Sequence, residues 1–174
     1  AQQTIATSAS RSAVAFEPLG IVLAVMPWNY PVWQVLRFAI PALMAGNACV
    51  VKPAPSVPQT TALLEQAIAE ANLSDYLQVA WIDHEQVEQA IALSDAVAFT
   101  GSTQTGRHIA SLAGKNLKKS VLELGGSNAF IVLDDADLDK TVAGAVASRF
   151  GNAGQTCIAA KRFIVQDGIA DEFV

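Results

Sequence analysis

The sequence predicts an α/β protein built on an open, mostly parallel β-sheet, and three observations lead to this fold class. From Gly20 onward, short apolar runs alternate with longer segments that carry apolar residues at helical spacing, which is typical of βαβ units. The short runs contain almost no polar residues, as expected for strands covered on both faces. Hydrophobic residues make up 52% of the 174 positions and charged residues 16%, so a substantial core is expected and global disorder is not.

The N-terminal third illustrates the pattern. Residues 1–18 are weakly patterned, and we expect a connector with room for one edge strand. A buried strand is predicted over residues 21–26, followed by a helix over 32–45 that Gly46 closes. Pro41 falls inside this helix and should kink or split it, because proline cannot donate the helical hydrogen bond.

The remaining elements continue the alternation. A helix is predicted over 57–71, because apolar residues recur there at helical spacing, as at Leu64, Ile68 and Ala71. Near the end of the chain, an acidic turn is expected at 171–172. Further strands are predicted at residues 48–51, 76–82, 96–99, 120–122, 129–133 and 162–165, and further helices at 85–93, 103–113 and 138–150.

Charge and hydropathy exclude several classes of partner. The net charge of −5 and the lack of a Lys/Arg run argue against a nucleic-acid surface. No apolar run approaches the roughly 18 residues that a membrane helix needs. Residues 1–12 lack the apolar centre of a signal peptide. We therefore expect a cytoplasmic protein that binds neither nucleic acid nor membrane.

The residues that follow the strands are the candidates for ligand binding, because ligands of an open parallel sheet collect beyond the C-terminal strand ends. Gly101-Ser102 opens a predicted helix, whose N-terminal N–H groups suit a phosphate; the alternative is that Ser102 only caps the helix. Lys52 ends another strand and could reach a phosphate or ribose, and its alternative is an ordinary surface lysine.

Two further strand ends carry groups suited to catalysis. Glu123 is a lone carboxylate that closes an apolar strand, and desolvation there would make it a suitable general base; the alternatives are a helix cap or a solvated acid. Asn29 lies between aromatic residues and prolines, which should fix its amide as a donor to a developing oxyanion.

The two cysteines occupy different settings. Cys157 lies in a glycine-rich polar loop after a predicted helix, where a thiol stays accessible; this loop alone leaves a nucleophile and a loop cysteine without a role equally open. Cys49 lies in an apolar run and is expected in the core. His84 and His108 fall on polar helices without metal-ligand spacing, so no metal is expected.

Five motifs follow one another along the chain. They are Pro27-Trp28-Asn29-Tyr30-Pro31, Lys52-Pro53-Ala54, Phe99-Thr100-Gly101-Ser102, Leu122-Glu123-Leu124-Gly125-Gly126 and Gly154-Gln155-Thr156-Cys157. In this order they resemble the motifs of the NAD(P)-dependent aldehyde dehydrogenase family. The resemblance covers the chain from about Phe16 to its end, and within the family it is greatest to the succinate-semialdehyde dehydrogenases.

The resemblance implies a role for each motif. Cys157 would attack the aldehyde, Asn29 and the Cys157 backbone N–H would hold the oxyanion, and Glu123 would activate water against the resulting thioester. This is covalent catalysis in two steps. The resemblance further implies a cofactor site lined by Trp28, Lys52, Gly101, Ser102 and Leu124.

Five positions bear on cofactor and substrate choice. Many family members that prefer NAD carry a glutamate three residues after the lysine, where this chain has Pro55 followed by Ser56, so either NAD or NADP is expected. Arg37 matches an arginine that binds the substrate carboxylate in some semialdehyde enzymes, and Tyr30 is expected beside the substrate. Their second arginine is replaced by Gly151.

The resemblance also implies a domain division and leaves alternatives open. Residues 1–18 would be a connector, 19–124 a Rossmann-like NAD(P)-binding domain, and 125–174 the start of a catalytic domain. Family chains are several times longer and oligomeric, so this chain by itself is expected to expose apolar surface. The alternatives are a nucleotide-binding module without turnover, an enzyme for another aldehyde, or an acylating relative that uses coenzyme A, which Glu123 disfavours.

Overall fold

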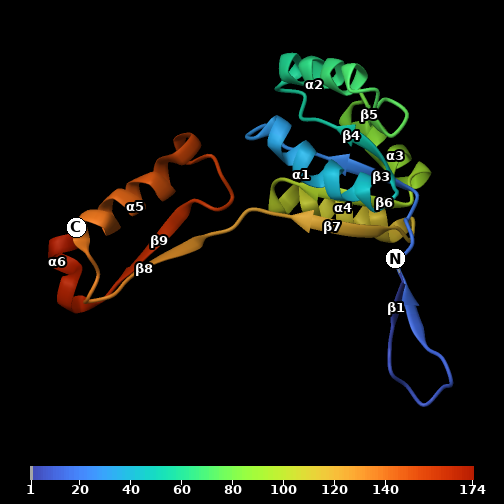
Figure 1. Cartoon of the computed structure of the whole chain (residues 1–174). Helices are drawn as coiled ribbons and strands as arrows, with labels where there is room; N and C mark the ends of the chain where they lie inside the picture. The colour runs from blue at the N-terminus through green and yellow to red at the C-terminus, as the bar shows by residue number, and fades with distance from the viewer. Residues whose placement is uncertain (1) are drawn as a thin grey trace. The chain divides into compact units, whose positions relative to one another are not determined.

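The computed structural model describes residues 2–174 (Figure 1). The chain divides into two compact units, one ending at Glu123 and the other running over Leu124–Val174. Each unit has its own sheet and its own helices.

The first unit is built on a five-stranded sheet in the order β5-β4-β3-β6-β7, with every pair parallel. This confirms the predicted open parallel sheet. The chain starts in the centre at β3, winds outward to β5, and returns to the centre at β6, which places the switch in direction between β3 and β6. The strands are β3 (Ile21–Val25), β4 (Ala48–Lys52), β5 (Leu77–Val79), β6 (Ala96–Thr100) and β7 (Lys119–Glu123).

Helices cover both faces of this sheet (Figure 1). Val35 and Ala39 of α1 and Leu64 and Ile68 of α2 pack on one face, in a core that includes the buried Cys49. The helices α3 and α4 contribute Ile91 and Ile109 to the rest of the buried interior. The helices are α1 (Pro31–Met44), α2 (Pro58–Glu70), α3 (Val87–Leu93) and α4 (Thr103–Lys115).

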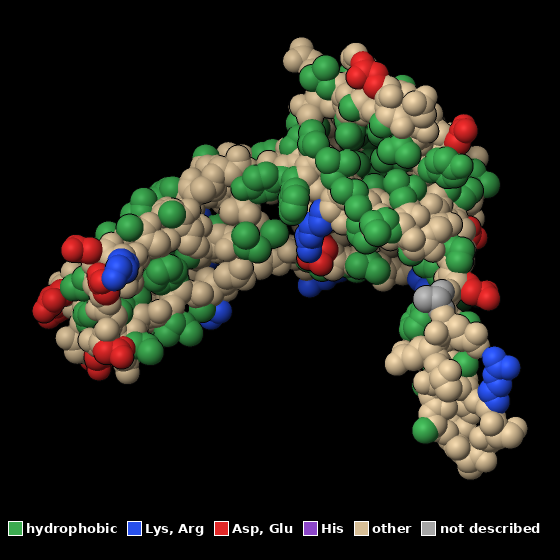
Figure 2. Space-filling view, in the orientation of Figure 1, with side chains coloured by type: hydrophobic (Ala, Val, Ile, Leu, Met, Phe, Trp, Pro, Cys, Tyr) green, Lys and Arg blue, Asp and Glu red, His purple; other side chains and the backbone are tan. Residues whose placement is uncertain are grey.

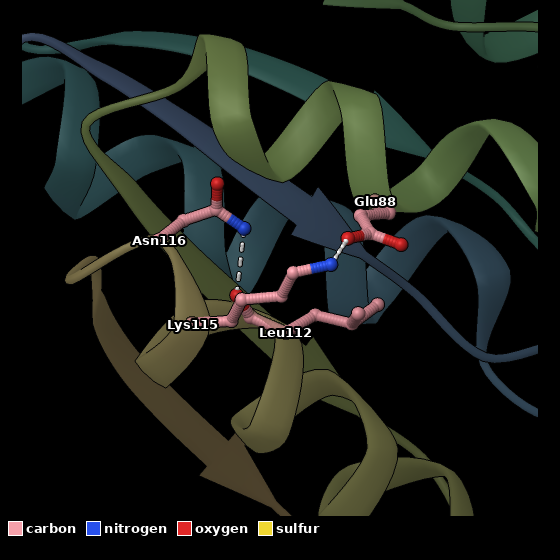
Figure 3. A network of polar contacts seen from close by, with 4 residues as sticks. All are labelled: Glu88, Leu112, Lys115 and Asn116. Carbon is pink, nitrogen blue, oxygen red and sulfur yellow. Dashed lines mark hydrogen bonds and ion pairs between the residues drawn. The ribbon is translucent and has the colours of Figure 1, made fainter.

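A polar network joins α3 to the C-terminal end of α4 (Figure 3). The ammonium of Lys115 donates to Glu88 Oε1 at 2.5 Å, and the side-chain amide of Asn116 donates to the carbonyl of Leu112 at 2.9 Å. The Leu112 carbonyl also accepts the backbone N–H of Asn116 at 3.2 Å, so Asn116 closes this helix end with two bonds to one carbonyl. The Lys115–Glu88 pair is exposed and is expected to add little stability.

Several predicted elements differ from those observed. Pro41 does not split α1, which is continuous through Met44; only one hydrogen bond is lost, near the helix end and on the exposed side. Residues 1–18 contain two paired strands, β1 (Gln2–Thr4) and β2 (Ala13–Ala15), rather than one edge strand. The helix predicted at 85–93 begins as a 3₁₀ turn, His84–Gln86, capped reciprocally by Asp83 and Gln86.

The second unit is a single βαβ arrangement. Strand β8 (Asn128–Val132) pairs in parallel with β9 (Ala160–Val165), and α5 (Leu138–Phe150) connects them through a short 3₁₀ turn, Gly151–Gly154. The acidic turn predicted near the end is instead a short helix, α6 (Ala170–Phe173). Hydrophobic side chains reach the surface of this unit (Figure 2), including Val146 and Phe150 of α5.

Candidate active site

The strand ends of the first unit form the candidate binding edge. The backbone pairing extends just past the strands, since Met26 N–H donates to the Lys52 carbonyl and Gly101 N–H to the Glu123 carbonyl, both at 3.0 Å. These bonds align the ends of β3, β4, β6 and β7. The structure therefore brings the segments carrying Asn29, Lys52, Gly101 and Glu123 to one edge, on either side of the switch between β3 and β6, where doubly wound sheets bind ligands.

The N-terminus of α4 opens onto this edge. The Ser102 hydroxyl accepts a hydrogen bond from Thr105 N–H at 3.1 Å, so Ser102 is the helix cap. The remaining N–H groups of the first turn have no partner within the helix and suit an anion. Gly101 is required by packing, because a Cβ there would lie 2.5 Å from the Phe99 ring.

Lys52 is not the surface lysine that the sequence left open. The residue is only 3% exposed, and its ammonium donates to the Pro53 carbonyl at 3.2 Å. Burial lowers the pKa of Lys52, while the charge of Asp83 opposes this shift. An ammonium has three donors, so this buried cation retains donors for a phosphate or ribose oxygen besides its bond to Pro53.

The other predicted ligand positions of this unit lie in two loops. Asn29 is half-buried on the bend after β3, Trp28 beside it is exposed, and half-buried Tyr30 precedes α1. Pro55 and Ser56 occupy an exposed turn after β4. No carboxylate stands at these two positions to repel a 2′-phosphate.

A pocket of about 180 Å³ opens beside β6 and β7. Arg37 of α1 and Glu123 at the end of β7 face each other there, with 3.8 Å between Arg37 Nη2 and Glu123 Oε1. The Glu123 side chain is 55% exposed, so the expectation of a desolvated carboxylate is wrong for this structure. Nonpolar side chains form most of the remaining wall: Met26, Phe38, Ala98, Phe99 and Val121.

In the second unit, Cys157 is partly exposed, in contrast to buried Cys49. Its loop begins with three consecutive left-handed residues, Asn152, Ala153 and Gly154, with φ values of 52°, 56° and 74°. Such a conformation is costly for residues other than glycine. Backbone strain just before a candidate nucleophile is typical of functional loops.

Two basic side chains fasten the segment before β8 to the start of β9. Lys161 donates to the Gly126 carbonyl at 2.6 Å, and Arg162 donates to the Ser127 carbonyl at 3.0 Å. A Cβ on Gly126 would lie 3.8 Å from the Cys157 carbonyl. The Gly125-Gly126 segment, which follows half-buried Leu124, therefore runs close to the Cys157 loop within this unit.

Three features of these sites were not predicted from the sequence. The Arg37–Glu123 pair joins residues far apart in the chain, and no local pattern signals it. The Arg149 guanidinium lies under the left-handed turn, and its buried Nη1 has no hydrogen-bond partner among the described residues. The third feature is the pair of hydrogen bonds from Lys161 and Arg162 to the segment before β8. The only sequence signal for it is that two basic residues stand near the start of a predicted strand.

The residues at the candidate binding edge fit a dinucleotide cofactor. The buried ammonium of Lys52, the first turn of α4 and the acid-free turn at Pro55-Ser56 would hold phosphate and ribose groups. Within residues 2–174 no three His, Cys, Asp or Glu side chains cluster to hold a metal ion. No helix of the described chain has the length and apolar character needed to cross a membrane.

The strand order, with helices on both faces of the sheet, defines a doubly wound α/β protein. The chain belongs to the aldehyde dehydrogenase family, whose family model matches residues 1–174. This confirms the resemblance found in the five sequence motifs.

The relatives include several succinate-semialdehyde dehydrogenases. A probable succinate-semialdehyde dehydrogenase [NADP(+)] of Synechocystis is 47% identical over 99% of this chain and 39% of its own length. The Escherichia coli succinate semialdehyde dehydrogenase [NAD(P)+] Sad is 47% identical over 94% of this chain and 36% of its own length. The chain thus spans under two fifths of the length of these relatives.

Solved structures of the same family have the same fold over the length of this chain. The succinic semialdehyde dehydrogenase of Streptococcus pyogenes, in complex with NADP+ as the cofactor, superimposes with a TM-score of 0.94 at 40% identity. The match covers 99% of this chain and 39% of that structure. The predicted fold class, an aldehyde dehydrogenase-like α/β fold present in part, is confirmed.

Proposed function

We propose that the protein is an aldehyde dehydrogenase that oxidises succinate semialdehyde to succinate with NADP+ or NAD+. The observation that carries this proposal is the pocket at the strand ends, where the Arg37 guanidinium faces Glu123 in a largely apolar wall. A small aldehyde with a distal carboxylate matches this lining, because a guanidinium binds carboxylates in a bidentate manner. The activity named for the relatives is the same.

In the proposed reaction, the Cys157 sulfur adds to the aldehyde carbon and forms a thiohemiacetal. The Asn29 amide and the Cys157 backbone N–H stabilise the negative oxygen. The oxidised nicotinamide, when bound, supplies the acceptor for the hydride that leaves the thiohemiacetal carbon. Glu123 then takes a proton from water, the hydroxide attacks the resulting thioester, and succinate and the Cys157 thiol are released.

The proposed cofactor site comprises Trp28, Lys52, Pro55, Ser56, Gly101, Ser102 and Leu124. The burial of Lys52 supports it most strongly, since a buried ammonium gains much from an anionic partner. Tyr30 would line the substrate side of the same edge. In domain terms, residues 19–124 would bind the cofactor, residues 125–174 would carry the nucleophile, and residues 1–18 would form a connector.

A cofactor and substrate panel on the full-length protein tests this proposal. We expect reduction of NADP+ or NAD+ that depends on succinate semialdehyde, with one succinate formed per cofactor reduced and no need for coenzyme A. Cofactor binding by calorimetry without any aldehyde-dependent reduction would contradict the enzymatic proposal and favour a binding module. A product that forms only when coenzyme A is present would point to an acylating enzyme.

A further inference from the structure

The pairing of Arg37 with Glu123 has a consequence for the timing of catalysis, if the proposed function holds. We propose that Arg37 is a positioning residue that holds the Glu123 carboxylate aside until the carboxylate of the substrate displaces it. The proposed general base would thus become more available when an aldehyde bearing a carboxylate occupies the pocket.

The geometry of the pair suits such an exchange. The two groups are 3.8 Å apart, too far for a strong hydrogen bond, and their side chains are 49% and 55% exposed. An ion pair with this exposure contributes little to stability. A second carboxylate can therefore compete for the guanidinium at small cost.

The lining of the pocket favours binding of an anion at Arg37. Among the described residues that line this pocket, Arg37 and Glu123 alone carry charge. Gln34 and Thr100 are neutral, and the rest of the lining is apolar. A substrate carboxylate that enters here meets one cation, and its preferred contact is the planar fork of the guanidinium.

Charge repulsion then explains why Glu123 would leave. One guanidinium balances one carboxylate, and a second carboxylate beside Glu123 adds the repulsion of like charges at short range. Glu123 ends strand β7, and more than half of its side chain is exposed, so it can rotate away from Arg37. An uncharged aldehyde causes no such displacement and leaves the pair intact.

This role differs from simple binding of the substrate carboxylate by Arg37. If Arg37 only bound the substrate carboxylate, its substitution would change the kinetics of aldehydes with a carboxylate and of no others. The displacement proposed here also slows the turnover of uncharged aldehydes, because with those substrates Glu123 remains held by Arg37 when the thioester must be hydrolysed.

Kinetics of the full-length protein with succinate semialdehyde and butanal separate these roles. In Arg37→Gln we expect kcat for butanal to rise by up to roughly fivefold, the effect of removing one exposed ion pair. The KM for succinate semialdehyde should rise by roughly 10- to 100-fold, because a charged hydrogen-bond partner is lost. Arg37→Lys keeps the charge and should restore the low butanal turnover.

Exposed Arg11 provides a matched control, since Arg11→Gln removes the same charge outside the pocket and should change neither parameter. An unchanged or reduced butanal kcat in Arg37→Gln would overturn the proposal. A wild-type protein that oxidises neither aldehyde would instead contradict the proposed function.

A measurement without turnover tests the displacement in either case. In protein labelled with ¹³C at glutamate carboxyl groups, the Glu123 signal is identified by its loss in Glu123→Gln. We expect added succinate to move this signal in the wild type toward its position in Arg37→Gln, and to have no effect on it in Arg37→Gln. A Glu123 signal that saturating succinate leaves in place would overturn the proposal.

Discussion

The two units of the chain differ in how completely each buries its own sheet. In the unit that ends at Glu123, helices cover both faces of five parallel strands, and it holds six of the seven largest fully buried side chains. The unit of residues 124–174 has two paired strands, and of these seven side chains it holds only Val132. A two-stranded sheet is marginally stable without additional packing.

This difference separates the proposed binding chemistry from the proposed covalent chemistry. The candidate binding edge rests on a well-packed sheet that fixes the backbone around Lys52 and Gly101. The candidate nucleophile Cys157 follows a left-handed turn in a unit with a small core. Substitutions at Lys52 and at Cys157 should therefore affect different properties, cofactor binding at Lys52 and chemistry or local stability at Cys157.

The largest expected effect is on the nucleophile. Cys157→Ala in the full-length protein should lower kcat by at least about 10³-fold, as removal of a nucleophile does in other covalent enzymes. NADP+ affinity, measured by calorimetry, should stay within about twofold, because the proposed cofactor contacts lie mainly in the other unit. Cys49→Ala is the matched control and should retain activity, since Cys49 is buried. Comparable losses of kcat in Cys157→Ala and Cys49→Ala would contradict the assignment of the nucleophile to Cys157.

At the candidate binding edge, a substitution should change cofactor affinity, which Cys157→Ala should leave nearly unchanged. Lys52→Met should weaken NADP+ binding by roughly 10- to 100-fold, the effect of losing a charged hydrogen bond. Stability should not fall, because the substitution removes a buried charge. Lys119→Met, at the exposed start of β7, removes the same charge and should leave affinity unchanged. Equal affinity in Lys52→Met and the wild type, by calorimetry, would exclude Lys52 from the cofactor site.

The core of the first unit should weaken at high pH. Burial raises the pKa of Cys49 from 9.0 to about 11, so between these values the unfolded chain loses a proton that the folded chain keeps. Stability contributed by the neutral thiol is therefore complete below pH 9 and falls as the pH rises toward 11, by on the order of 2 kcal/mol.

Urea unfolding of the wild type and of Cys49→Ala across this pH range measures the effect. The difference in unfolding free energy between the two proteins should shrink as the pH rises. A difference that stays constant from pH 8 to pH 11 would show that Cys49 titrates normally in the fold.

The smallest effect is expected in the loop before Cys157. Gly154 has a φ of 74°, and a Cβ there would lie 2.7 Å from Arg149 Nη1. Gly154→Ala should destabilise the protein by roughly 1–2 kcal/mol and lower kcat. Gly151→Ala is the matched control, because a Cβ there meets no atom within 4 Å. Equal thermal stability of both variants would show that the turn carries no strain.

The sequence was a good guide where the pattern is local and repeated. Alternating apolar runs predicted every strand of the five-stranded sheet, and α5 was predicted with its observed ends. Strand ends also identified the segments gathered at the binding edge, since parallel strands share one C-terminal edge. The resemblance carried by the five motifs added the family, which periodicity alone could not provide.

Prediction failed where long-range packing decides the outcome. Pro41 was expected to kink or split α1. The helix is not split, because the exposed proline lies near the helix end, where the lost hydrogen bond costs little. The burial of Lys52 and the exposure of Glu123 depend on neighbours distant in the chain. For the same reason no local pattern could have paired Arg37 with Glu123.

The central claim is that Cys157 forms a thioester with the substrate, and trapping that intermediate tests it most directly. Full-length protein is mixed with succinate semialdehyde and NADP+, quenched in acid during turnover, digested, and analysed by mass spectrometry. We predict the mass of one succinyl group on the peptide that contains Cys157, increased in Glu123→Gln because hydrolysis is slowed. A succinyl group on another residue, or turnover without any acylated Cys157 in either protein, would contradict the account.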